Sequence, residues 1–164
     1  MKNLLIILAF TMFFSCNKSD EAEVPYGSNI DRGIQLSVFN SENEDLLNPE
    51  NPNHLDESKI KLFYVIDGIE KEFYNSNLDH PRNIFIFEDE IDNVDKIGIT
   101  MNDTETSEKP ITYIRWNDVD SDTIEATYER DGPGIVLKNK VWLNGEQVWE
   151  RGDNTTNAYF ILVK

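Results

Sequence analysis

Cysteine and histidine are nearly absent from the 164-residue chain. Cys16 is its one cysteine, so no disulfide can form within the chain and no Cys-based zinc site can be assembled. His54 and His80 are the only histidines. His80 could act as a catalytic base only with a nucleophile, and no serine of the chain lies in a Gly-x-Ser-x-Gly motif. The sequence Asp79-His80-Pro81 is instead typical of a surface turn. We therefore expect a protein that is not an enzyme and has no cofactor.

Positive charge is also scarce, with 15 Lys and Arg against 31 Asp and Glu and a net charge of −16. A field of this sign repels nucleic acid and anionic lipid headgroups, which excludes nucleic-acid binding proteins. Once the N-terminal leader described below is removed, 149 residues (164 − 15) remain. A chain of that length buries roughly 68–70% of its unfolded surface, enough for one domain without disulfides.

The first fifteen residues predict an export signal. Met1 to Asn3 contains one positive charge, and Leu4 to Phe14 is an uncharged apolar run of eleven residues. As a helix this run reaches only about 16 Å, well short of the ~30 Å hydrocarbon core of a bilayer. The segment 1–15 is therefore predicted to be a signal peptide and not a permanent membrane span.

Phe13-Phe14-Ser15-Cys16 resembles a bacterial lipobox, in which a small residue precedes a lipidated cysteine. Lys18, Asp20 and Glu21 resemble the Lys-then-acidic export tag of lipoproteins of the Bacteroidota. The resemblance, to small surface lipoproteins of that phylum, implies acylation of Cys16 and a membrane anchor made by its lipid. It implies an outer-membrane location with the domain exposed at the cell surface, or alternatively facing the periplasm. It implies no activity.

Behind the anchor, residues 16–28 predict a flexible tether and residues 29–164 a single domain, because only the second segment contains regular apolar alternation. The alternation predicts an all-β fold, an antiparallel sandwich of about eight to ten strands, with a barrel as the alternative. Residues 40–58 form the one long connection, and its prolines exclude a central strand. The expected strands are Gly33–Phe39, Lys59–Ile66, Glu70–Tyr74, Asn83–Phe87, Lys96–Met101, Ile111–Trp116, Thr123–Tyr128, Ile135–Leu143, Gln147–Glu150 and Ala158–Val163.

Asn144-Gly145 predicts a two-residue hairpin turn that fixes which side chains share a face. A regular ladder from this turn places Trp142 and Trp149 on one face, opposite the apolar face of Val141 and Val148. Indoles flanked by cations can bind sugar rings or an acidic partner. The alternative is that both tryptophans are buried under a second sheet or under the long connection. The candidate ligand-binding residues are Trp142, Trp149, Lys138, Lys140 and Arg151.

Two further patterns suggest sites. Asp118, Asp120, Asp122 and Glu129 have the spacing of EF-hand ligands, although Thr123 replaces the glycine of that loop and a strand pattern follows. We keep Asp118, Asp120 and Asp122 as a candidate Ca²⁺ loop. The tripeptide at residues 151–153, Arg-Gly-Asp, matches an integrin-binding motif but is also ordinary turn chemistry.

These observations favour a non-enzymatic surface lipoprotein that binds an extracellular glycan or a protein partner. An accessory subunit of a larger surface complex is the alternative, and a secreted hydrolase is the weakest one, since no acid–base pair can be named.

Overall fold

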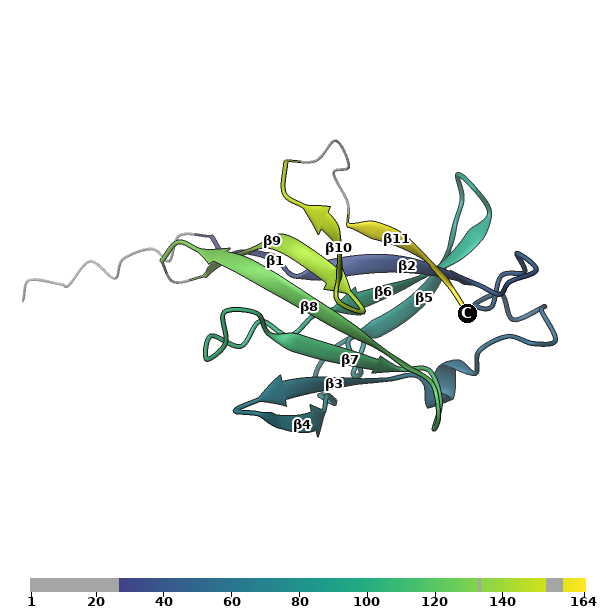
Figure 1. Ribbon diagram of the computed structural model, residues 1–164, viewed down its shortest axis with the longest axis horizontal. Coiled ribbons are helices and arrows are strands. Elements are labelled where there is room, and N and C mark those ends of the chain that lie inside the picture. Colours follow the sequence, from purple (N-terminus) through teal and green to yellow (C-terminus); the bar gives the residue numbers. More distant parts are fainter. Residues whose placement is uncertain (1–26, 133, 153–157) are drawn as a thin grey trace, which may run out of the picture.

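The computed structural model describes residues 27–132, 134–152 and 158–164 (Figure 1). The predicted signal peptide, Cys16 and the export tag lie outside these residues. Within them there is no α-helix, only one 3₁₀ turn, η1, over Glu57–Lys59, and no helix that could cross a membrane. The strands are β1 (Asn29–Asp31), β2 (Gly33–Phe39), β3 (Lys61–Ile66), β4 (Ile69–Glu72), β5 (Ile84–Asp89), β6 (Val94–Thr100), β7 (Ile111–Arg115), β8 (Ser121–Arg130), β9 (Ile135–Leu143), β10 (Glu146–Glu150) and β11 (Tyr159–Val163).

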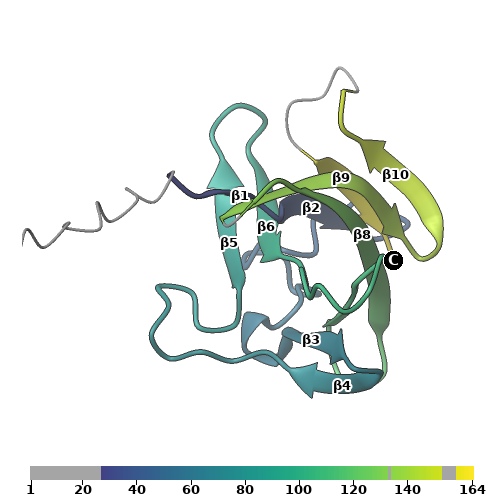
Figure 2. The same ribbon diagram turned by 90° about the vertical axis from the view of Figure 1, so that its left-hand side faces the viewer.

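The strands form two sheets. The seven-stranded sheet has the order β1-β9-β8-β7-β3-β4, with β10 also paired to β9, and the four-stranded sheet has the order β11-β2-β6-β5. The two sheets pack against each other through one core, and β5 and β6 lie above β3 and β4 in Figure 2. The predicted β-sandwich is confirmed, and the sheets do not close into a barrel. Two pairings are parallel, β1 with β9 and β11 with β2, so the sheets are mixed and not purely antiparallel.

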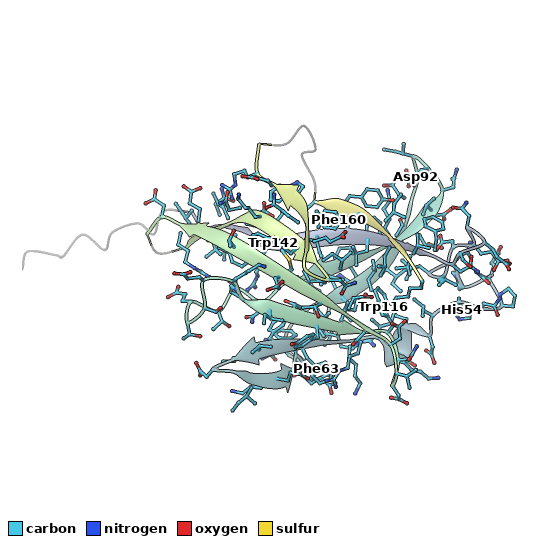
Figure 3. All side chains as sticks on the ribbon, viewed as in Figure 1. His54, Phe63, Asp92, Trp116, Trp142 and Phe160 are labelled. Carbon is cyan, nitrogen blue, oxygen red and sulfur yellow. The ribbon has the colours of Figure 1, made fainter. Side chains whose placement is uncertain are left out.

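Alternation along the strands builds the core. In β2, Ile34, Leu36 and Val38 point inward and are at most 3% exposed, as period-two spacing requires. The same spacing buries Ile97 and Ile99 of β6 against them. Trp116 lies in this interior and is 1% exposed (Figure 3). The inner faces of both sheets thus meet in one apolar layer.

Two tyrosines, the buried Tyr64 and the partly buried Tyr128, connect the sheets. The Tyr64 hydroxyl of β3 donates to the Thr100 carbonyl oxygen of β6 at 2.7 Å, and the Tyr128 hydroxyl of β8 donates to the Asn102 carbonyl oxygen at 3.0 Å. Burial raises the pKa of Tyr64 to about 12, and it raises the pKa of Tyr128 as well. Both phenols therefore stay protonated and donating at physiological pH. These bonds fix the end of β6, where the candidate site lies.

The long connection over residues 40–58 is ordered by local hydrogen bonds. Side-chain oxygens of Asn40, Asp45 and Asn48 each accept from a backbone N–H two residues further on. Leu46 and Leu47 are buried in the core, 8% and 3% exposed. The connection therefore covers one end of the sandwich.

Candidate functional site

A β-bulge in the β9–β10 hairpin changes the predicted faces. Asn144 and Gly145 have positive φ angles of 51° and 84°, as the predicted turn requires, and Trp142 pairs with Gln147 as expected. The register then shifts at Val148, so Trp149 pairs with Val141 and not with Lys140. Trp149 consequently points into the core and is 7% exposed. The prediction that Trp142 and Trp149 share an outer face is wrong.

Trp142 stays on the outer face of the seven-stranded sheet, where cations of the chain itself occupy the surroundings (Figure 3). The Lys109 ammonium lies 3.9 Å from the centroid of the Trp142 ring and forms an ion pair of 3.1 Å with Glu125. Lys140 forms an ion pair of 3.0 Å with Glu150. The two-indole surface predicted for this hairpin is therefore not formed.

The other two cations of that prediction are also engaged. Lys138 is 5% exposed, forms an ion pair with Asp31, and lies 5.2 Å from the Trp149 ring centroid. The Arg151 guanidinium donates from Nε to the Lys138 carbonyl oxygen at 3.0 Å and contacts Glu129. The aspartate of the Arg-Gly-Asp tripeptide, residue 153, lies outside the described residues.

Two carboxylates of the predicted calcium loop form ion pairs with a lysine from another part of the chain. Asp120 and Asp122 converge on the Lys164 ammonium, each at 2.8 Å. Asp122 also accepts from Trp116 Nε1 at 2.6 Å and from Asn144 Nδ2 at 2.7 Å. Burial alone raises the pKa of Asp122, but the hydrogen bonds from Lys164, Asn144 and Trp116 outweigh it and hold the pKa below its usual value.

No group of three His, Cys, Asp or Glu side chains that could hold a metal ion occurs in the described part of the chain. Asp118 is not part of the Lys164 cluster and lines a separate hollow with Lys61 and Arg115. The structure thus gives Asp118, Asp120 and Asp122 no shared ligand geometry, because a side-chain ammonium already satisfies two of the three carboxylates.

The outer face of the four-stranded sheet contains a row of aromatic rings that the sequence analysis did not select. In β5, Ile84 and Ile86 point to the core, so Phe85 and Phe87 point outward. The Phe85 ring stacks on Phe87 at 5.4 Å and on His80, from the preceding loop, at 4.8 Å between centroids. Phe85 remains 38% exposed.

Gly98 allows the Phe85 ring to lie across the neighbouring strand. These two residues are directly opposite in the β5–β6 ladder. A Cβ atom at Gly98 would lie 2.3 Å from Cζ of Phe85, closer than any real contact. Only glycine therefore admits the ring at this position.

Beside this ring is a cavity of about 230 Å³, which we call the Phe85 hollow. It lies where β1, β2, β6 and β9 come together. The Gln35 amide and the Thr100 hydroxyl line it, and neither makes a side-chain hydrogen bond within the residues the structure describes. The full lining is Asp31, Gly33, Ile34, Gln35, Phe85, Gly98, Ile99, Thr100, Lys138 and Ala158.

A second cavity, of about 220 Å³, is also lined by Phe85. Its lining includes Asp79, His80 and Asn83, and it shares Phe85 and Thr100 with the Phe85 hollow. Phe85 and Thr100 therefore border two adjacent depressions. Aromatic surface with a few polar groups in a concavity is the usual composition of a small-molecule site.

A signal for this site was present in the sequence. The run Ile84-Phe85-Ile86-Phe87 is apolar at every position, whereas a strand with one solvated face alternates apolar and polar residues. A continuous apolar run at a sheet edge indicates either a covered outer face or a surface that binds something. The residues from distant strands, Asp31, Gln35 and Thr100, had no such signal.

No family model matches the chain, and neither does any curated protein or solved structure.

Proposed function

We propose that the protein is a lipid-anchored surface protein that binds an extracellular ligand at the outer face of its four-stranded sheet and performs no catalysis. The observation that supports this most directly is the exposed Phe85 ring, which borders two cavities. Exposed aromatic side chains beside a concavity give large contact areas at low entropic cost. The predicted acylation of Cys16, with the tag Lys18, Asp20 and Glu21, would keep this face outside the cell.

A structural role in a surface complex is the second candidate, and one observation favours it. Ile161 and Val163 of β11 are 61% and 63% exposed on the same outer face. Adjacent exposed apolar side chains are a common feature of protein–protein contacts. Binding at this face of the sheet would then involve a protein partner and not a small ligand.

The anchor is tested by Cys16→Ala in the producing cell. Labelled palmitate should no longer be incorporated, and the protein should leave the membrane fraction, because the proposed acyl chains would hold it to the bilayer. Surface exposure is tested by protease added to intact cells, with the triple variant Lys18→Ala, Asp20→Ala, Glu21→Ala as the comparison. Unchanged labelling of Cys16→Ala would exclude the anchor.

The binding face is tested by Phe85→Ala on immobilised arrays of extracellular glycans and proteins. Loss of the Phe85 ring should lower the affinity for any ligand of this face at least tenfold, since the ring is the main apolar surface of the site. Phe63→Ala is the matched control, because Phe63 is an aromatic residue on the outer face of the other sheet. Ligands that bind both variants as well as the unaltered protein would disprove the proposed face.

A further inference from the structure

We infer that the ligand of the Phe85 hollow is a neutral sugar, held with an apolar ring face on Phe85 and its hydroxyls on Asp31, Gln35 and Thr100. This inference rests on the proposed function and specifies its ligand. Three properties of the hollow support it, and they concern its polar groups, its charge and its shape.

Three polar side chains of the hollow, Asp31, Gln35 and Thr100, retain hydrogen-bonding capacity of the kind that binds hydroxyls. The Gln35 amide can donate and accept, and the Thr100 hydroxyl can do both. Asp31 uses only Oδ1 toward Lys138, so its Oδ2 can accept a further hydrogen bond. A polyol presents several donors and acceptors at short spacing, whereas an aliphatic or aromatic ligand would leave these groups unsatisfied at a cost. The mixture of one ring and three polar side chains that retain hydrogen-bonding capacity therefore fits a sugar.

The charge of the site excludes an acidic ligand. Lys138 is the one cation that lines the hollow, and its ammonium is already paired with Asp31. Asp79 adds a carboxylate to the adjoining cavity. With 31 acidic against 15 basic residues, the whole chain repels anions as well. Uronates and sulfated sugars would meet a negative potential with no free cation lining the hollow to compensate it.

The shape of the hollow depends on two glycines. Gly98 admits the Phe85 ring, and Gly33 keeps the opposite wall open, since a Cβ atom at Gly33 would have no neighbour within 4 Å. Gly33 lies outside the positive-φ region, so a larger residue there is not strained. A side chain at position 33 would occupy space next to Gln35 without removing any group of the site. This property gives a direct test.

The test measures binding of Gly33→Leu to soluble neutral polysaccharides, namely a dextran, a mannan, an arabinogalactan and a xylan, with polygalacturonate as the acidic probe. Affinity electrophoresis and titration calorimetry give the dissociation constants. We expect the unaltered protein to bind at least one neutral polysaccharide and Gly33→Leu to bind it at least tenfold more weakly. Gln35→Ala should weaken the same binding by three- to tenfold. Gly27→Leu is the matched control, because Gly27 also has free space around its Cβ but lies outside the hollow.

Each outcome separates this inference from the function on which it rests. Failure of all four neutral polysaccharides to bind, or stronger binding of polygalacturonate, overturns the sugar inference. A ligand from the arrays that depends on Phe85 but is unaffected by Gly33→Leu also overturns it, while the proposed face survives. Equal thermal midpoints for Gly33→Leu and Gly27→Leu show that loss of binding is not loss of folding.

Discussion

The outer faces of both sheets carry aromatic rings that lie under cations of the chain, but on the four-stranded sheet that cation, Lys96, covers Tyr159 at 4.6 Å and not the Phe85 ring. On the seven-stranded sheet, Lys109 lies 3.9 Å from the Trp142 ring and Arg115 lies 3.8 Å from the Phe63 ring. Both cations also form ion pairs, Lys109 with Glu125 and Arg115 with Glu70. On the four-stranded sheet, Phe85 and Phe87 stack only on each other and on His80 among the described residues.

The difference shows that ring content alone does not identify a binding face. A ligand at Trp142 would have to displace a cation that is held by both a ring and a carboxylate, which opposes binding. A ligand at Phe85 displaces water from an apolar surface, which favours it. The Phe85 region, where no cation of the described residues lies over the ring, is therefore the better candidate for binding.

The largest expected effect separates the two tryptophans of the hairpin. Trp149→Ala should destabilise the domain by about 3–5 kcal/mol, because a cavity opens in the core. Trp142→Ala removes a half-exposed ring and should cost less than about 1.5 kcal/mol. Urea unfolding of the two single variants measures both losses. Similar losses for the two variants would contradict the placement of Trp149 in the core and Trp142 on the outer face.

A smaller loss is expected where the Phe85 ring crosses Gly98. Gly98→Ala should cost about 1–3 kcal/mol, because the new Cβ pushes the ring out of its place. Gly33→Ala, with open space around it, should change stability by less than about 0.5 kcal/mol. In Phe85→Ala the obstructing ring is gone, so adding Gly98→Ala should cost little more. Additive losses in the double variant would contradict the close contact.

Acid should weaken the link that Lys164 makes between the end of β11 and β8. The pKa of Asp122 is lower in the folded protein than the ~3.9 of an unfolded chain. Its contribution to stability is therefore complete above about pH 4 and is lost as the pH falls through the folded pKa. Asp122→Asn should flatten the dependence of unfolding free energy on pH between about 5 and 2. An unchanged slope would show that Asp122 does not supply this stability.

The smallest effect on stability is expected for Lys109, the cation that lies over the Trp142 ring. Lys109→Ala should change stability by about 0.5 kcal/mol or less, since its ring contact and ion pair are both at the surface. It should nevertheless uncover Trp142 and increase quenching of indole fluorescence by acrylamide. Lys140→Ala is the control, because Lys140 pairs with Glu150 and lies over no aromatic ring of the described residues. Equal quenching in the two variants would mean that Lys109 does not shield the ring.

The strands could be predicted from the sequence because period-two alternation is a local property. All ten expected strands are present, and β2 and β9 have the expected bounds. The three-residue strand β1 was missed, since Asn29, Ile30 and Asp31 show no alternation of their own. The parallel pairing of β11 with β2 could not be derived either, because alternation says nothing about which strands become neighbours.

The candidate site was harder to predict because its parts are distant in sequence. Asp31 and Lys138 are 107 positions apart and meet only because β1 pairs with β9. Asp120 and Asp122 suggested a metal, but their partner, Lys164, comes from the far end of the chain. Charge spacing within one loop cannot reveal a cation supplied by another strand.

The bulge at Val148 can be compared in free energy with the regular register of the same hairpin. A regular ladder buries Val148, whereas the bulged ladder buries Trp149 instead. Burying the indole in place of the valine removes about 100 Å² more apolar surface from water, worth about 2.5 kcal/mol, against about 1 kcal/mol for a disturbed ladder hydrogen bond. The side chain at position 149 therefore supplies the free energy that favours the bulged register over the regular one. The bulge thus exchanges a buried valine for a buried indole, and one side chain decides which face of β10 joins the core.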